Sequence, residues 1–147
     1  AGPDQGTLFL QAIGGATDAE GIMVPNGWFA EANNPGNAQM VQEYVAKYGG
    51  TYDGMSADVP EAYSVGEVLQ QAVTKIGSLD QTKLIQELHS DTFTSVQGNV
   101  AFDTTGQNKD ASSYLFQWQQ GSLVPIYPPG TTGAKMPEYP RPNWPSH

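Results

Sequence analysis

Helical periodicity of hydrophobic residues runs through the middle of the chain, and it constrains the fold more than any other sequence feature. A first amphipathic helix is predicted after Pro35-Gly36, and Gly49-Gly50 ends it. Its apolar stripe consists of Met40, Val41, Tyr44, Val45 and Tyr48. A helix with one apolar stripe must bury that stripe against another element, so this segment belongs to a packed domain.

Two further helices are predicted directly after the first. One begins at Asp58, which forms a capping-box pattern with Glu61, and ends at Gly77. The apolar residues of this helix are Val65, Val68, Leu69, Ala72, Val73 and Ile76. The next helix is capped by Ser78 or Asp80, and its inward residues are Leu84, Ile85 and Leu88. Two helices joined so closely favour a helical hairpin.

Short strands are predicted on both sides of the helices. Residues 21–24 form a short apolar run that is typical of a buried strand. Residues 114–119 and 123–127 are predicted to form a hairpin that turns at Gln120-Gly121, with Pro125 placing its second strand at a sheet edge. The mixture of helices and strands indicates an α/β or α+β domain.

The C-terminal segment is unusually rich in proline, since seven of the 11 prolines lie between Pro125 and Pro145. Proline cannot donate a ladder hydrogen bond and it restricts the preceding residue, so this segment is predicted to be an extended arm. The alternative is a disordered end. Tyr139 and Trp144 favour an arm that packs against the body, because disordered tails are usually poor in aromatic residues.

Composition excludes several classes of function. The net charge is −9, and the six basic residues are scattered, which argues against a nucleic-acid partner. The absence of cysteine excludes disulfides and cysteine-ligated metals. No apolar run approaches the ~18–20 residues that span a bilayer, and no signal-peptide pattern opens the chain.

No catalytic or metal-binding constellation stands out. His89 and His147 are not spaced as a pair of metal ligands, and the segment around Asp103 lacks the closing glutamate of a calcium loop. His89 instead suits the C-terminal end of its helix. Ser56 lacks the second glycine of a nucleophile elbow. We therefore expect no enzyme, no metal site and no cofactor.

Aromatic residues beside the predicted elements are the remaining signal for a binding site. Trp28 follows the strand at 21–24, where α/β proteins often form a ligand crevice, although a core or hinge tryptophan fits equally well. Tyr63 lies in the first turn of the helix that begins at Asp58. Because helix N-termini favour carboxylate ligands, residues 58–63 are a second candidate for ligand recognition.

Four segments occur in the order and spacing of one known family. They read EGIMVPNGWF at 20–29, VQEYVAKYGG through KLIQEL at 41–88, TSVQGNVAFDTTGQN at 94–108 and YLFQWQQGSLVPIYPP at 114–129. Together they resemble the C-terminal part of type I periplasmic substrate-binding proteins, in the branched-chain amino-acid (leucine/isoleucine/valine) group that serves ABC transporters.

The resemblance implies an α/β fold of two lobes, each a parallel sheet flanked by helices, with three hinge crossings and the ligand between the lobes. It places residues 1–28 in the second lobe and residues 29–113 in the first lobe. Residues 114–127 are then a return hairpin of the second lobe, and 128–147 are a Pro-rich C-terminal arm. Members of the family are roughly twice this length or more, so the chain resembles a C-terminal fragment.

The resemblance also implies a function and its partners. The chain is expected to be part of an extracytoplasmic solute-binding subunit of an ABC importer that takes an amino acid or a related small polar ligand. Its expected partners are the membrane permease and either the N-terminal remainder or a second copy of the chain. The expected location is periplasmic or extracellular, with a lipid anchor in a preceding region. The alternatives are a ligand-sensing receptor domain of the same fold and a non-catalytic assembly module.

Site residues carry over from the family at a few positions. Gly2-Pro3-Asp4 matches the family's Gly-Pro-acid triplet, whose carboxylate receives the ammonium group of the ligand, so Asp4 is the expected ammonium-binding residue. Trp28, Asp58 and Tyr63 correspond to regions that face the cleft in relatives. These four residues are the ligand-binding residues that the sequence predicts.

Overall fold

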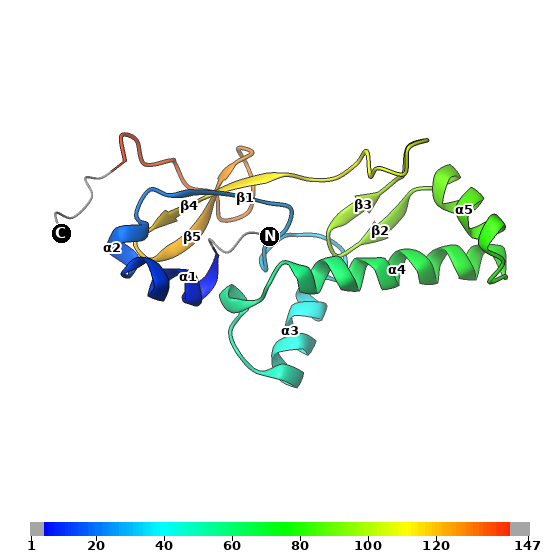
Figure 1. Cartoon of the computed structure of the whole chain (residues 1–147), viewed down its shortest axis with the longest axis horizontal. Helices are drawn as coiled ribbons and strands as arrows, with labels where there is room; N and C mark the ends of the chain where they lie inside the picture. The colour runs from blue at the N-terminus through cyan, green and yellow to red at the C-terminus, as the bar shows by residue number, and fades with distance from the viewer. Residues whose placement is uncertain (1–4, 142–147) are drawn as a thin grey trace.

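The computed structural model describes residues 5–141, which form two bodies that lie end to end along the long axis of the molecule (Figure 1). The sheet body contains β1, β4 and β5 with α1 and α2, and the helical body contains α3, α4 and α5 with the β2–β3 hairpin. The helices are α1 Gly6–Ile13, α2 Ala16–Ala19, α3 Asn37–Tyr48, α4 Asp58–Ile76 and α5 Gln81–Ser90, with a 3₁₀ turn at Tyr52–Gly54. The strands are β1 Met23–Asn26, β2 Phe93–Ser95, β3 Gly98–Val100, β4 Tyr114–Gln119 and β5 Ser122–Tyr127.

The sheet body joins segments from both ends of the chain. Its strand order is β1-β4-β5, so β4 pairs with a strand that lies about 90 residues earlier in the sequence. The predicted hairpin is confirmed: Gln120 and Gly121 both have positive φ (54° and 77°), as a two-residue turn between twisted strands requires. Pro125 lies on the edge strand β5, also as predicted. The core of this body consists of Ala19, Val24, Phe116 and Trp118, with Phe9 stacked on Trp118.

All strand pairs within residues 5–141 are antiparallel, which corrects the expectation of parallel sheets for the pairs that this chain makes. The β2–β3 and β4–β5 pairs are hairpins, and a short turn can only reverse the direction of the chain. β1 pairs with the central strand β4 and leaves its own outer edge open among the described residues. A parallel pair in this body would therefore need a strand from outside these residues.

The three predicted helices are confirmed as α3, α4 and α5. Asp80 is the N-cap of α5, where its carboxylate accepts a hydrogen bond from the Lys83 N–H at 3.0 Å. The capping box predicted at Asp58 is wrong, because Ala57 stands at the N-cap and Asp58 is already the first helical residue. The Glu61 N–H donates to the Ala57 carbonyl, and the Asp58 carboxylate accepts from the Ser56 hydroxyl instead.

Only part of the predicted apolar stripe of α4 is covered. Val68 and Ala72 pack with Phe93 and Val100 of the β2–β3 hairpin, as one core of the helical body. Val65 and Leu69 are 60% and 44% exposed, and Ile85 on α5, also predicted inward, is 57% exposed. The sequence carries more apolar surface on these helices than the described residues bury.

The β2–β3 hairpin is closed on its outer edge by side chains of α4. The Gln71 amide both donates to the Thr94 carbonyl (2.8 Å) and accepts from the Thr94 N–H (3.2 Å), as a neighbouring strand would. The Glu67 carboxylate accepts from the Val96 N–H at 2.9 Å. Edge groups paired in this way are not available to another strand. The sequence did not reveal β2, whose three residues show no alternation long enough to recognise.

The predicted arm packs against the sheet body through residues 128–141. Gln117, which is fully buried on β4, donates to the Glu138 carbonyl (3.1 Å) and accepts from the Glu138 N–H (2.7 Å). Gln119 donates to the Met136 carbonyl at 2.9 Å. The aromatic residues do not explain the packing, since Tyr139 is 88% exposed and Trp144 lies outside the described residues.

The carboxyl group of Glu138 is expected to make the docking of the arm sensitive to pH. A side-chain hydrogen bond with Glu20 raises the pKa of Glu138 above its ordinary value. A raised pKa means that the folded state binds the proton more tightly than the unfolded state does, so protonation stabilises the folded state. This contribution is complete at pH values below the unfolded-state pKa, and it is lost as the pH rises through the folded-state pKa. We therefore expect the melting temperature of Glu138→Gln, relative to the wild type, to increase between pH 4 and pH 7. Glu43→Gln on the exposed side of α3 is the control, and a flat difference for Glu138→Gln would contradict the prediction.

Candidate functional site

A cavity lies where the chain passes between the two bodies. The chain leaves the sheet body after β1 and returns to it at β4, so two crossing segments connect the bodies (Figure 1). The cavity has a volume of about 460 Å³, within the ~300–1,000 Å³ that is usual for small-molecule sites. Its wall combines residues 28–31 of the first crossing, residues 54–57 before α4, Gln5-Gly6 at the start of α1 and residues 121–123 of the β4–β5 hairpin.

Trp28 lines this cavity and is also a core residue. Its side chain is 3% exposed and packs with Met40, Val41 and Val96 in the second core of the molecule. Its indole Nε1 donates to Oδ1 of the fully buried Asn37 at 2.7 Å. The two interpretations of Trp28 from the sequence, crevice and core, therefore describe the same side chain.

Asn37 holds the first crossing segment in place. Its Nδ2 donates to the carbonyls of Ala30 (3.0 Å) and Ala32 (2.9 Å), while its Oδ1 receives the Trp28 indole. A single buried amide thus fixes both the backbone of the crossing and the aromatic wall of the cavity. The sequence did not indicate a role for Asn37, because an asparagine after Pro-Gly is typical of an ordinary helix start.

The other predicted site residues lie at different places. Asp58 begins α4 next to Ser56 and Ala57, which line the cavity, but Asp58 itself is not among the lining residues. Tyr63 is 46% exposed further along α4 and does not line the cavity either. Asp4 lies outside the described residues. The cavity thus brings together Trp28 and the residues just before α4.

Gln5 and Asn26 also line the cavity, although the sequence did not predict them as site residues. Asn26 ends β1 and Gln5 precedes α1, and their side-chain amides are hydrogen-bonded to each other at 3.2 Å. Asn26 stands in a Pro-Asn-Gly sequence that signals only the end of a strand. Nothing in the local sequence distinguishes Gln5 from a surface glutamine.

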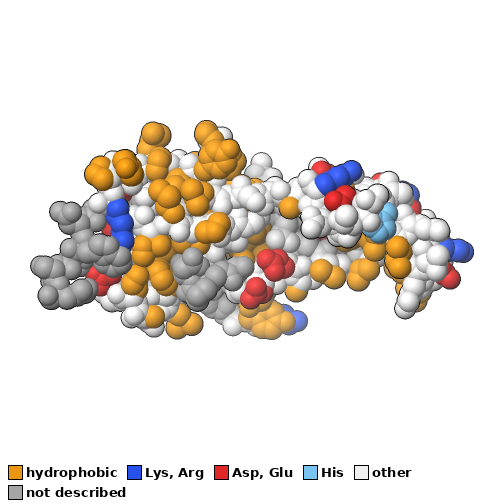
Figure 2. Space-filling view, turned by 45° about the horizontal axis from the view of Figure 1, so that its top comes forward, with side chains coloured by type: hydrophobic (Ala, Val, Ile, Leu, Met, Phe, Trp, Pro, Cys, Tyr) orange, Lys and Arg blue, Asp and Glu red, His pale blue; other side chains and the backbone are white. Residues whose placement is uncertain are grey.

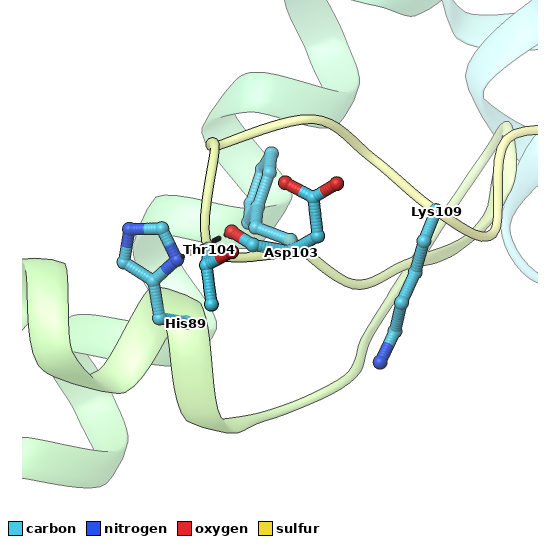
Figure 3. A pocket seen from close by; sticks show the side chains of 5 residues that line it. His89, Asp103, Thr104 and Lys109 are labelled. Carbon is cyan, nitrogen blue, oxygen red and sulfur yellow. Dashed lines mark hydrogen bonds between the residues drawn. The ribbon is translucent and has the colours of Figure 1, made fainter.

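A second, shallow depression lies at the far end of the helical body, between α5 and the loop after β3 (Figure 3). The His89 ring Nδ1 lies 2.8 Å from the Asp103 carbonyl, in agreement with a role at the helix end. The Asp103 carboxylate is occupied by its own turn: hydrogen bonds from Thr105 and Gln107 hold its pKa below the ordinary value. Lys109 extends away from the other labelled side chains. The polar groups here stabilise a loop.

Within the residues that the structure describes, no group of three or more His, Asp or Glu side chains could hold a metal ion. The helices of residues 5–141 are all too short or too polar to cross a membrane.

The fold and a sequence family model together define the class of the protein. A small-molecule cavity at the junction of two α/β bodies is a common arrangement in proteins that bind ligands between domains. The sequence model of the family described as "periplasmic binding protein" matches residues 1–122, and the chain belongs to this family. Proteins of this family bind solutes, and membership implies a periplasmic location.

Individual relatives agree with this assignment. The leucine-, isoleucine-, valine-, threonine- and alanine-binding protein of Pseudomonas aeruginosa is 28% identical over 87 residues, which are 59% of this chain and 22% of the relative. An ABC-type branched-chain amino acid transporter structure from Rhodopseudomonas palustris superposes with a TM-score of 0.62 at 21% identity, over 79% of this chain and 32% of that one. A solute-binding protein from R. palustris in complex with benzoate gives a TM-score of 0.60 at 19% identity, over 74% and 30% of the two chains. The chain spans between about a fifth and a third of the length of these proteins.

Proposed function

We propose that this chain is part of the solute-binding subunit of an ABC importer, and that the ligand binds in the cavity at the junction of the two bodies. The observation that carries the proposal is the cavity itself, because its wall is shared by both bodies and by the first crossing segment. A ligand in this cavity would contact both bodies and the crossing segment, and these are the parts that move relative to each other in a hinge closure. In this proposal the sheet body, with residues 1–28 and 114–127, is the second lobe, and residues 29–113 belong to the first lobe. Two crossings lie within the chain, and a third belongs to the rest of the protein.

The ligand is proposed to be an amino acid or a related small carboxylate. The names of the relatives support this class, since they include a binding protein for aliphatic amino acids and a complex with benzoate. Trp28 would form an apolar wall beside the ligand, and Asp4 would receive an ammonium group. Asp58 and Tyr63 are proposed to act at the margin of the site, because the segment that leads into α4 lines the cavity.

The uncovered surfaces of the chain fit a larger protein. Hydrophobic side chains gather over the left part of the molecule in Figure 2, which is the sheet body, and Leu8 and Met23 are exposed there. Val65 and Leu69 leave an apolar strip on α4, and β1 has an open edge among the described residues. We propose that the preceding part of a longer protein covers these surfaces, with a second copy of the chain as the alternative. Delivery of the ligand to a membrane permease and a lipid anchor in a preceding region complete the proposal.

Ligand binding is tested with the full-length protein. We expect at least one of L-leucine, L-valine, L-threonine, L-alanine, L-glutamine and benzoate to raise the melting temperature and to give a saturable isotherm in calorimetry. A ligand at 100 times its dissociation constant stabilises a folded protein by about 2.7 kcal/mol, which is readily measured. D-leucine is a control for stereochemical selectivity among the amino acids. Failure of the whole panel to bind would contradict the proposed function.

A further inference from the structure

The amide pair of Gln5 and Asn26 lies in the wall of the cavity, and it has a defined direction. The backbone N–H of Gly27 donates to Asn26 Oδ1 at 2.8 Å, and a backbone N–H can only donate. The oxygen of Asn26 is therefore fixed toward Gly27, and its Nδ2 is the group that points to Gln5. That nitrogen donates to Gln5 Oε1 at 3.2 Å.

This chain of hydrogen bonds leaves the Gln5 Nε2 as the last group. Nε2 is shielded from solvent and has no hydrogen-bond partner among the described residues. Gln5 is also the N-cap of α1 but makes no side-chain capping bond, so the helix does not account for its orientation. A shielded donor without an acceptor has lost its hydrogen bonds to water without replacement, and an oxygen atom that comes within hydrogen-bond distance of it recovers that loss.

We propose that Gln5 is a ligand-selecting residue, whose Nε2 donates a hydrogen bond to an oxygen atom of the ligand. This inference rests on the proposed function, because it assumes that the ligand occupies the cavity that Gln5 lines. It adds a requirement on the ligand class: the group that faces the start of α1 is a carboxylate, carbonyl or hydroxyl oxygen. An ammonium group or an apolar group in that place leaves Nε2 unpaired, and a site built to hydrogen-bond a polar group discriminates strongly against such ligands.

The first test replaces the donor. Gln5→Met keeps the length of the side chain without the amide, and Gln5→Glu replaces the donor with an acceptor. In the full-length protein we expect Gln5→Met to weaken the binding of L-leucine, L-threonine or benzoate, whichever the wild type binds, by roughly 3- to 10-fold in calorimetry. Because these probes all carry a carboxylate, Gln5→Glu should weaken binding further. Gln86→Met, at an exposed position on α5, is the matched control and should leave the affinity unchanged.

The second test changes the direction of the Gln5 side-chain amide without substituting Gln5. In Asn26→Asp the introduced carboxylate still accepts from Gly27 but no longer donates to Gln5, so Gln5 turns and donates its Nε2 to that carboxylate. The donor is then used up, and we expect a loss of affinity similar to that of Gln5→Met. The double variant Gln5→Met/Asn26→Asp should lose little more than either single variant, because both changes remove the same hydrogen bond.

The outcomes separate the two proposals. If the wild type binds a probe and Gln5→Met binds it equally well, the role of Gln5 is overturned and the proposed function stands. Additive losses in the double variant would likewise overturn it, because they would assign Asn26 a separate effect. If the wild type binds none of the probes, the proposed function fails, and the inference fails with it. Melting temperatures of each variant without ligand identify any loss that comes from unfolding.

Discussion

Replacing Trp28 by alanine is expected to lower the free energy of unfolding by about 3–5 kcal/mol, the usual cost of removing a large buried side chain. The indole is 3% exposed, packs with Met40, Val41 and Val96, and is tied to Asn37 by a 2.7 Å hydrogen bond. The change would also open the wall of the cavity. Urea unfolding of the full-length protein, followed by circular dichroism, measures the effect.

Two further variants separate packing from hydrogen bonding at this position. Trp28→Phe keeps most of the apolar contact but leaves Asn37 Oδ1 without its donor, so it should cost about 1–3 kcal/mol. Tyr48→Ala, at an exposed position on α3, should cost less than about 1 kcal/mol. If Trp28→Ala costs no more than Tyr48→Ala, Trp28 is not part of the core that joins the first crossing to α3.

Gln117→Leu is expected to release the C-terminal arm and to destabilise the protein by about 2–4 kcal/mol. Leucine removes a fully buried amide and leaves the Glu138 N–H, the Glu138 carbonyl and the Gly21 carbonyl without their Gln117 partner. Trypsin cleavage after Lys135 should become faster, because the arm no longer binds along β4. Urea unfolding and the rate of that cleavage are the two measurements.

Gln86→Leu on α5 is the control for the loss of a glutamine at an exposed site. It should change neither the stability nor the cleavage rate. Protection of Lys135 that is unchanged in Gln117→Leu would show that the arm is held by other contacts, such as the hydrogen bond from the Arg141 guanidinium to the Glu20 carbonyl.

Several side-chain amides of this protein have structural roles that their positions in the sequence do not indicate. Gln71 completes the edge of a hairpin, Asn37 fixes a crossing segment, and Gln117 clamps the arm. Each uses both its donor and its acceptor, which a carboxylate or an ammonium group cannot do. This use of amides accompanies the low charged fraction of 14%.

The cavity could be predicted only in part. Trp28 was among the predicted residues and does line the cavity, although the sequence left open whether it was a crevice or a core residue. Gln5 could not, because its importance comes from Asn26, which is 21 residues away in the sequence. The capping box at Asp58 was a wrong prediction for a related reason: the spacing of Asp58 and Glu61 fits the pattern, but Ala57 takes the N-cap position before them.

The sequence by itself determined the three central helices, the β4–β5 hairpin and the family. Helical periodicity, glycine stops and the Asp80 cap specified α3, α4 and α5, because they depend on residues within a few positions of each other. The tertiary structure alone decided that β1 pairs with β4, that the pairing is antiparallel, and that a cavity opens between the bodies. These features depend on contacts between residues far apart in the chain, and periodicity carries no information about which distant segments meet.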